Sequence, residues 1–347
     1  MLTPAGRHII GGMFGLETMA DHRDSHPPFL SDNVVFLANA RSGIRLLIEQ
    51  LAPDCVWMPS FYCDHVLKIV EEYATAVRYY EVDYDLAIPS LAWVEAVQSN
   101  DLVVITDYFG FPCSVECKKR VKERGAWLLE DACQALLTEK SGNDSDFVLF
   151  SPRKFLGVPD GGILTTKHGS VPVNISMSAP PAEWWLKAFS ASALRREFDT
   201  YGGDRRWFNL FQESEITAPI GAYAMSELTR MLLQHGFNYP LIAEQRVENY
   251  KLLASTLCEI ALFPTLPEGV VPLGFPIRVA DRDRIRHRLF EYDIFPPVHW
   301  PIKGVVPEKF IGSHRLSAEI MTLPCDQRYA GDDMHRIAAA VLKEMPS

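Results

Sequence analysis

Residues Phe150–Thr166 read FSPRKFLGVPDGGILTT and carry a single lysine, Lys154, between two short apolar runs. Apolar runs of this length are typical of buried strands, and the PDGG between them is typical of a turn. Lys154 is therefore expected at the end of a strand, where a loop begins. A lysine at such a place is usually a solvated surface residue. The alternative is an amine placed there for chemistry.

The chain around this stretch alternates strand-like and helix-like segments from about residue 34 onward. The strand-like runs are VVFLA (34–38), CVWMPSF (55–61), AVRYYEVD (76–83), LVVITDYFG (102–110), WLLEDA (127–132), DFVLFS (146–151) and GGILTT (161–166). The helix-like segments are SGIRLLIEQL (42–51), DHVLKIVEEYA (64–74) and SVECKKRVKERG (114–125). Such alternation predicts an α/β fold with a mainly parallel central sheet and helices on both faces. Ligands of such sheets bind beyond the carboxyl ends of the strands.

The pattern changes in the second half of the chain. Segments 218–236 and 242–257 both read as helices, and residues 275–300 and 332–345 mix strand-like and helix-like runs. We expect a large domain over residues 1–240 and a small C-terminal α+β domain over residues 241–347. The segment 168–215, with its proline and tryptophan clusters, is expected to be irregular.

The composition argues against several classes of protein. There are 34 Lys and Arg against 44 Asp and Glu, a formal net charge of −10, so neither a nucleic acid nor a membrane surface is expected as a partner. No apolar segment approaches the length of a membrane span, and the N-terminal residues lack a signal-peptide pattern. Seven scattered cysteines fit a reducing cytoplasm better than a disulfide framework. Cys113 and Cys117 lack metal-site spacing, so no metal is expected.

Asp131 and Gln134 lie in the stretch LLEDACQAL (128–136), where an apolar run ends. Asp131 could cap a helix, or it could face a pocket and keep a heterocyclic nitrogen protonated. Lys154 follows another such run, and the neighbouring cation Arg153 would favour a reactive amine able to form a Schiff base. Ser151 offers a hydroxyl to a phosphate. Together these groups suit a phosphorylated aldehyde with a ring nitrogen, which is the form of pyridoxal phosphate.

EDACQALL, FSPRKFLGVPDGGILTT and PPVHWP resemble segments of the DegT/DnrJ/EryC1/StrS aminotransferases, and the resemblance runs in order from about Asn33 to the C-terminus. It implies a fold type I enzyme that uses pyridoxal phosphate. It also implies transfer of an amino group from an amino acid, usually glutamate, to a keto sugar linked to a nucleotide. Such a product would serve surface polysaccharide biosynthesis. A homodimer is implied too, because fold type I enzymes usually build their site between two subunits.

The resemblance assigns roles to five residues. Lys154 would attach the cofactor covalently and move the proton during catalysis. Asp131 would pair with the pyridinium nitrogen, and Gln134 would contact the cofactor ring or its hydroxyl. Arg41 and Ser42 match the place where members bind the phosphate, although a plain capped helix would also explain them. A helix N-terminus favours an anion there on physical grounds as well.

Three aromatic or imidazole side chains are further candidates. MPSFYCDHV (58–66) matches the segment from which members stack an aromatic ring on the cofactor, and both Phe61 and Tyr62 remain possible. His299 in PPVHWP matches a histidine that members direct toward the substrate. Ordinary core packing would account for each of the three equally well.

The sequence also departs from the family pattern. Members usually carry a serine five residues before the lysine, where this chain has Leu149, so Ser151 is the expected phosphate contact. Members present an Asn and an Arg before a Met-Ser pair, where this chain has Ala222 and Ala224. These changes favour one rival reading, a catalytically silent homologue that serves as a binding or regulatory subunit. A second rival, a sugar dehydratase of the same fold, is disfavoured because Lys154 is retained. A nicotinamide oxidoreductase is disfavoured by the absence of a G-x-G-x-x-G motif after a strand.

Overall fold

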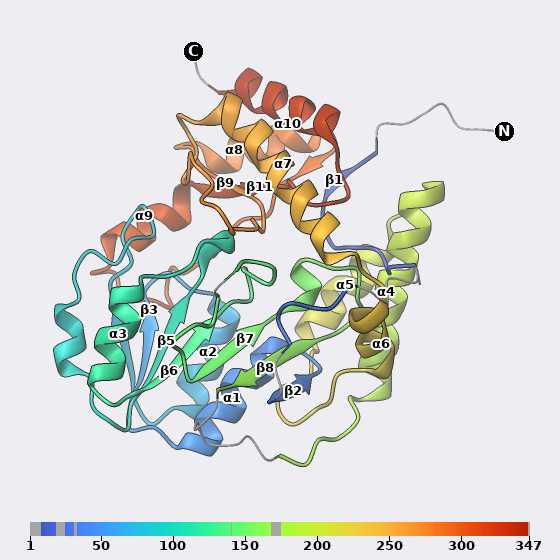
Figure 1. The fold of residues 1–347 in the computed structure, drawn as a ribbon. Helices are drawn as coiled ribbons and strands as arrows, with labels where there is room; N and C mark the ends of the chain where they lie inside the picture. The colour runs from blue at the N-terminus through green and yellow to red at the C-terminus, as the bar shows by residue number, and fades with distance from the viewer. Residues whose placement is uncertain (1–7, 19–24, 31–32, 140, 168–174, 346–347) are drawn as a thin grey trace.

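The computed structural model describes residues 8–18, 25–30, 33–139, 141–167 and 175–345. Its centre is a seven-stranded sheet of strand order β2-β8-β7-β6-β5-β3-β4, with helices packed around it (Figure 1). The strands are β2 (Val34–Leu37), β3 (Val56–Pro59), β4 (Val77–Tyr80), β5 (Leu102–Thr106), β6 (Trp127–Asp131), β7 (Phe147–Phe150) and β8 (Gly162–Thr166). Neighbours from β4 to β7 are parallel, whereas β8 is antiparallel to β7 and β2. The predicted mainly parallel sheet is confirmed.

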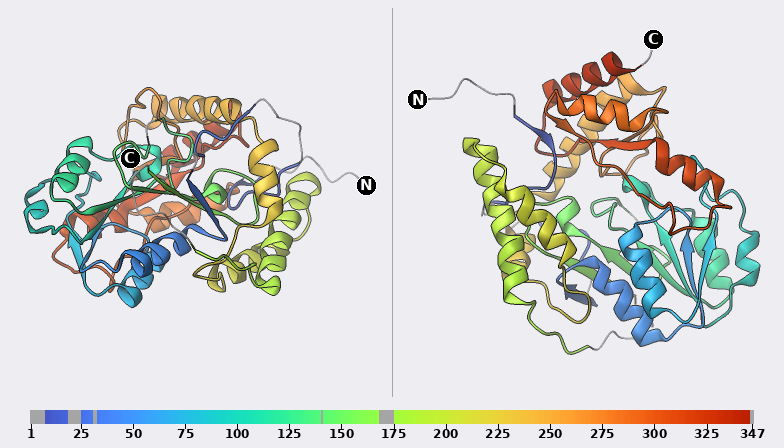
Figure 2. Two further views of the ribbon diagram at one scale, coloured as in Figure 1. Left: turned by 60° about the horizontal axis from the view of Figure 1, so that its bottom comes forward. Right: turned by 180° about the vertical axis from the view of Figure 1, so that it is seen from behind.

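Helices cover both faces of this sheet. The connection from β3 to β4 runs toward one edge, and the connection from β5 to β6 runs toward the other. Because crossovers between parallel strands are right-handed, α2 (Asp64–Tyr73) and α3 (Val115–Glu123) lie on opposite faces, and α1 (Ala40–Leu51) packs beside α2 (Figure 2). The direction reverses between β3 and β5, which is where a ligand crevice is expected.

Two glycines explain the turn that follows Lys154. Gly161 has a φ of 129°, which lies in the region that favours glycine, and its N–H donates to Ala38 O at 2.8 Å. Gly162 begins β8, and a Cβ there would lie 2.3 Å from the carbonyl carbon of Asn39. The glycine pair therefore lets β8 pass directly against the start of α1, so the lysine loop and that helix N-terminus are neighbours.

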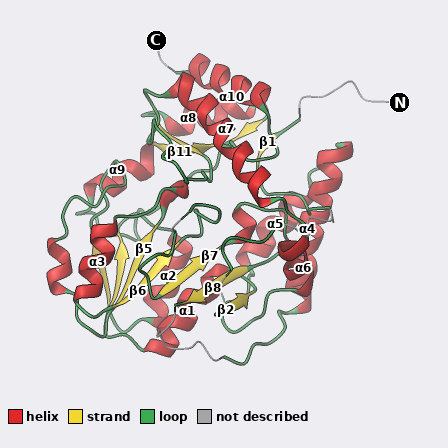
Figure 3. Ribbon diagram, in the orientation of Figure 1, coloured by secondary structure: helices red, strands yellow, loops and turns green. Residues whose placement is uncertain are grey.

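A smaller unit of mixed helices and strands covers the carboxyl edge of the sheet (Figure 3). Its strands are β9 (Phe275–Arg278) and β11 (Ile320–Leu323), which are antiparallel, and β1 (Ile10–Gly11), which pairs in parallel with β10 (Ile294–Phe295). Its helices are α7 (Tyr239–Leu257), α8 (Arg282–Phe290), α9 (Ile311–Glu319) and α10 (Gly331–Glu344). Most of these elements share a second hydrophobic core, and the α+β character expected of this region is confirmed.

Two helices occupy most of the segment expected to be irregular, so that expectation is wrong for the described residues. They are α4 (Ala182–Tyr201) and α5 (Arg206–Ile216), which pack against each other. Their pattern was hidden because, apart from Trp184, α4 buries small or charged side chains and exposes several large apolar ones. The buried side chains include Ala188, Ala191 and Arg195, and the exposed ones include Leu186, Leu194 and Tyr201. Residues 168–174 lie outside the described residues.

The helix expected over 218–236 is shorter than the sequence suggested. It is α6 (Glu227–His235), and Ser226 caps it by accepting from Thr229 N at 3.2 Å. The residues before it are extended, and Ala38 N donates to Tyr223 O at 2.8 Å. Within the described ranges, no helix is long and apolar enough to cross a lipid bilayer.

Candidate active site

Four strands, β3, β5, β6 and β7, bring polar side chains to one edge of the sheet, because the carboxyl ends of parallel strands meet there. A cavity of about 140 Å³ lies at this edge. Six residues singled out from the sequence line it: Arg41, Tyr62, Asp131, Gln134, Ser151 and Lys154. Ser42, Phe61 and His299 do not line it.

The Asp131 carboxylate ends β6 with both oxygens hydrogen-bonded. Oδ1 accepts from Cys133 N at 2.9 Å, and Oδ2 accepts from the hydroxyl of Tyr62. Among the described residues, no helix lies between β6, which Asp131 ends, and β7, so the helix-capping alternative does not apply. Its side chain instead caps a turn and faces the cavity. A carboxylate fixed in this way can hold one orientation toward a ligand.

Tyr62 and Phe61 differ in their placement. The Tyr62 ring lines the cavity, and burial, reinforced by Asp131, raises the pKa of its hydroxyl well above the usual value. Tyr62 therefore remains a proton donor to Asp131 at neutral pH. Phe61 is fully buried, and its ring packs against Trp300 with centroids 5.3 Å apart. Of the two candidates, only Tyr62 is in a position to touch a ligand in the cavity.

Gln134 lines the cavity and has an unused hydrogen-bond donor. Its Oε1 accepts from Phe109 N at 2.7 Å, whereas its buried Nε2 has no hydrogen-bond partner among the described residues. A buried polar group without a partner costs about 1–3 kcal/mol. Such a group is therefore usually retained for a ligand or a water molecule. An oxygen on a ring held beside Asp131 would satisfy it.

Lys154 combines a fixed backbone with a free amine. It ends a short 3₁₀ turn, Pro152–Lys154, and the next carbonyl, Phe155 O, accepts from Arg246 Nη2 at 3.2 Å and from Gln327 Nε2 at 2.7 Å. Both donors come from the C-terminal half of the chain. No described residue forms a hydrogen bond or ion pair with Lys154 Nζ. The amine is thus available to a ligand in the cavity.

Ser151 and Leu149 define another wall of the cavity. Ser151 is largely buried and lines the cavity near Lys154, which suits its expected phosphate contact. Leu149, at the position where members carry a serine, also lines the cavity but has no hydroxyl to offer a phosphate. Ala222 and Ala224 do not line it. Both lie in a segment that is hydrogen-bonded to Ser178.

The hydroxyl of Ser42 is engaged within the fold. It bonds to Asn39 Oδ1 at 3.2 Å and accepts from Gly221 N at 3.1 Å. Asn39 also accepts from Ser42 N at 3.1 Å and so caps α1. The capped-helix alternative therefore describes Ser42, whereas Arg41 lines the cavity.

His299 lies behind the cavity wall rather than in it. Its ring packs edge-on against Phe109 and Trp300, with centroids 5.2 and 5.3 Å apart, and its Nδ1 is 3.1 Å from Thr322 Oγ1. Burial, assisted by the positive charge of Lys154, lowers the pKa of His299 to about 3. The ring is therefore neutral and supports Trp300, which does line the cavity.

The depressed pKa of His299 makes folding stability depend on pH. Below its ordinary pKa of 6.5, the unfolded chain binds a proton at this position that the folded protein excludes, so stability falls with falling pH. We expect this group to cost about 1–2 kcal/mol between pH 7 and pH 5. Urea unfolding at both pH values should show a smaller loss in His299→Gln. Exposed His287→Gln should match the wild type, and equal pH dependence in all three proteins would contradict the assignment.

Arg153, Glu215 and Trp300 also line the cavity, and their positions were not assigned from the sequence. Arg153 Nη2 pairs with Glu215 Oε1, and Arg41 Nη2 lies 3.9 Å from Glu215 Oε2. The sequence indicated Arg153 only as the cation beside Lys154 and gave it no contact with a ligand. Glu215 carried no sequence signal, because its helix was not expected.

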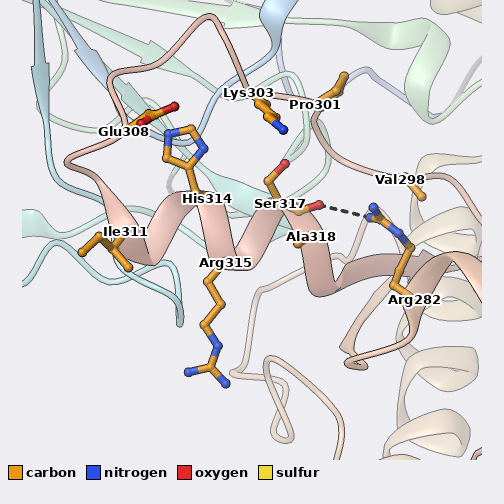
Figure 4. Close-up of a pocket in the computed structure, with 10 residues that line it drawn as sticks. All are labelled: Arg282, Val298, Pro301, Lys303, Glu308, Ile311, His314, Arg315, Ser317 and Ala318. Atoms are coloured by element: carbon orange, nitrogen blue, oxygen red, sulfur yellow. Dashed lines mark hydrogen bonds between the residues drawn. The ribbon is translucent and has the colours of Figure 1, made fainter.

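A second, larger cavity of about 600 Å³ lies beneath α9, and Figure 4 shows its lining. Lys303 and Glu308 project from the preceding loop, whereas Arg315 points to the opposite side of the helix. Arg282 is occupied by the carbonyls of Ser317 and Ile320, at 3.2 and 2.8 Å. None of its lining residues comes from the carboxyl ends of the parallel strands, so we place the site at the smaller cavity.

The smaller cavity fits the cofactor that the resemblance implies. Asp131 suits a protonated ring nitrogen, the unpartnered Nε2 of Gln134 suits a ring oxygen, and the free Nζ of Lys154 suits an aldehyde carbon. Ser151 and Arg41 are the available phosphate contacts. The donor set therefore suits pyridoxal phosphate.

Comparison with solved structures shows the same fold in several known proteins. PseC of Helicobacter pylori, an aminotransferase involved in the biosynthesis of pseudoaminic acid, superposes with a TM-score of 0.68 at 16% identity, covering 97% of this chain and 92% of that chain. Spr1654 of Streptococcus pneumoniae, a candidate sugar aminotransferase solved in its PLP-form, gives 0.67 at 16% identity, covering 99% and 94%. DesV of S. venezuelae gives 0.63 at 17% identity, covering 99% and 92%.

At these identities the structural likeness establishes a shared fold. No curated protein sequence matches the chain significantly. A family model, however, matches residues 32–342, which is nearly the whole chain. The match includes the strand ends that carry Asp131 and Lys154. The chain therefore belongs to the DegT/DnrJ/EryC1/StrS aminotransferase family, whose members are enzymes dependent on pyridoxal phosphate.

Proposed function

We propose that the protein transfers the amino group of an amino acid, with glutamate as the expected donor, to a keto sugar linked to a nucleotide. The observation that carries this proposal is the free Nζ of Lys154 in one cavity with the Asp131 carboxylate and the unpartnered Nε2 of Gln134. Membership of a family with sugar aminotransferase neighbours supports the class of acceptor. Surface polysaccharide biosynthesis is the expected use of the product.

The residues of the chain divide the work between them. Bound pyridoxal phosphate supplies an electron sink beside the substrate carbon that loses or gains a proton. Lys154 Nζ removes that proton from the donor carbon, holds it, and returns it at the other end of the exchange, as a general base and then a general acid. Asp131 keeps the ring nitrogen protonated, and Tyr62 holds the Asp131 carboxylate in place. In the second half-reaction the same groups act on the acceptor in reverse.

Three further expectations belong to this proposal. We propose that residues 1–240 bind the cofactor and that residues 241–347 form the small domain beside it. Support comes from α7, whose first turns join the core of the sheet and whose later turns join the second core. We also propose that the protein is a cytoplasmic homodimer. A monomer in light scattering would contradict the dimer.

A catalytically silent subunit is the second candidate function. The changed positions Leu149, Ala222 and Ala224 favour it, because each lacks a polar group usual in the family. The intact set of Lys154 and Asp131 argues against it, since a protein that only binds has no use for a free amine at this place. The two functions differ in whether bound cofactor reacts with an amino acid.

Absorbance spectroscopy separates these two functions. Purified protein incubated with pyridoxal phosphate should show a visible band, L-glutamate should shift that band, and 2-oxoglutarate should restore it. Nucleotide-linked keto sugars should also restore it and should be aminated, as judged by mass spectrometry. A band that no amino acid shifts would support the silent subunit. Restoration by 2-oxoglutarate alone would leave the aminotransferase intact but remove the sugar acceptor.

A further inference from the structure

Two arginines hold one carboxylate at the edge of the catalytic cavity. Arg153 Nη2 pairs with Glu215 Oε1, while Arg41 Nη2 lies 3.9 Å from Glu215 Oε2 and donates to Glu215 O at 3.1 Å. All three residues line the cavity that contains Lys154. Their side chains are 19%, 22% and 35% exposed for Arg41, Arg153 and Glu215. The cluster is therefore part of the site and is only partly shielded from solvent.

The charges of this cluster favour an oxyanion between the two guanidinium groups. Burial lowers the pKa of Arg41, and the nearby charge of Arg153 lowers it further, so the pair needs a negative partner. Burial alone would raise the pKa of Glu215, but Arg153 and Arg41 overcome that effect and hold it below its usual value. Glu215 is thus ionised. Arginine pairs of this kind recognise carboxylates and phosphates through two-pronged hydrogen bonds.

Other groups at the cavity also favour an incoming anion. Three cationic side chains line it, and of the two anionic ones Asp131 is already satisfied by Tyr62 and Cys133 N. The volume of about 140 Å³ is below the roughly 300 Å³ at which small-molecule sites begin, so a ligand requires a lining side chain to move. Glu215 is suited to move, because it lies one residue from the end of α5 and is partly exposed.

We propose that Arg41 and Arg153 form an oxyanion subsite and that Glu215 occupies it until the anionic group of a ligand takes its place. The exchange keeps both arginines paired, so it replaces one ion pair with another. The ligand groups follow from the proposed function, on which this inference rests: the phosphate of the cofactor, or the carboxylate of the amino donor. Both present the same chemistry to the two guanidinium groups.

The first test uses protein without cofactor and inorganic phosphate as the probe, so it requires no transamination. Isothermal titration should show roughly 10- to 100-fold tighter phosphate binding in Glu215→Gln, because the internal competitor is gone, and similarly weaker binding in Arg153→Met. Arg153→Lys, which keeps the charge, should lie between the wild type and Arg153→Met. The matched control is Glu213→Gln, which removes an exposed carboxylate of the same helix paired with Lys187 and should bind as the wild type does.

Unchanged or weaker phosphate binding in Glu215→Gln would overturn the inference, since Glu215 would then only hold the arginines in place. Tighter binding in Glu213→Gln as well would also overturn it, because the effect would be one of net charge. If phosphate binding changes as expected but the wild type transfers no amino group, the result counts against the proposed function and not against the oxyanion subsite. Circular dichroism of each variant establishes that the comparison is made on folded protein.

The second test distinguishes the two sources of the anion. If the cofactor phosphate takes the subsite, Glu215→Gln should tighten binding of pyridoxal phosphate and leave binding of pyridoxal unchanged. If the donor carboxylate takes it, the variant loaded with cofactor should bind glutarate, a dicarboxylate without an amine, more tightly by the same factor. Either result supports the subsite and names its ligand. No change in either measurement would overturn it.

Discussion

Replacing Lys154 with alanine is expected to slow amino transfer by about 10⁴-fold or more, because one substitution removes both the covalent attachment point and the proton carrier. The loss should appear in the turnover number rather than in substrate affinity, since Arg41, Asp131 and Gln134 still line the cavity. Turnover of glutamate with 2-oxo acids and with nucleotide-linked keto sugars measures the effect.

Chemical labelling tests the role of Lys154 without a measurement of turnover. Borohydride reduction of the loaded wild type should fix the cofactor on the peptide that contains Lys154, and mass spectrometry should find no such peptide in the variant. Lys303→Ala is the matched control, because Lys303 lines the larger cavity and should have no effect. Cofactor fixed on another lysine, or amino transfer retained in Lys154→Ala, would refute the assignment.

The part of the site that lies on parallel strands was predictable. Buried parallel strands read as continuous apolar runs, so the ends of β6 and β7 are visible as the points where LLED and VLFS become polar. Asp131 ends β6 and Lys154 follows the end of β7, and the carboxyl ends of parallel strands meet. The sequence could not tell which of Phe61 and Tyr62 faces the cavity. Adjacent residues of an extended segment face opposite directions, and both side chains here are aromatic.

The part of the site that depends on α5 was not predictable. Glu215 meets Arg153 across 62 positions of sequence. The helix that carries it follows α4, whose buried side chains are as different as Trp184, Ala188 and Arg195, while Leu186 and Leu194 are exposed. A periodicity argument detects helices that bury large side chains along one face. Periodicity of this kind is absent from α4, so the helix pair was not expected and Glu215 was missed.

A second large effect is expected beneath the catalytic edge, at the ion pair between Lys118 of α3 and Glu130 of β6. Lys118 Nζ lies 2.6 Å from Glu130 Oε2, and both side chains are almost completely buried. Ser145 Oγ and Gly142 N also donate to Glu130, at 2.5 and 2.7 Å. Glu130 immediately precedes Asp131 in β6, so its side chain points to the face of the sheet opposite to that of Asp131.

Asp107 is a second buried carboxyl group whose charge Lys118 compensates. It follows β5, is completely buried, and accepts from Cys113 N at 2.8 Å and from Ser141 Oγ at 2.9 Å. Burial, with the negative charge of Glu130, raises the pKa of Asp107 to about 8, and Lys118 opposes this rise. Because the folded protein holds a proton there that the unfolded chain releases near pH 4, this group makes stability fall as the pH rises toward 8.

Lys118→Met is therefore expected to destabilise the protein by about 3–5 kcal/mol, since it leaves two buried carboxyl groups without their cation. The loss should be larger at pH 8 than at pH 6, because more of the uncompensated charge must then be ionised. Urea unfolding at both pH values measures it.

Lys118→Met combined with Glu130→Gln should recover much of the loss, as expected when both partners of a buried pair are replaced. Lys122→Met, on the same helix but in a partly exposed pair with Asp146, should cost less than about 1 kcal/mol. Equal losses at Lys118 and Lys122 would show that the buried pair holds no special place in the stability of this edge.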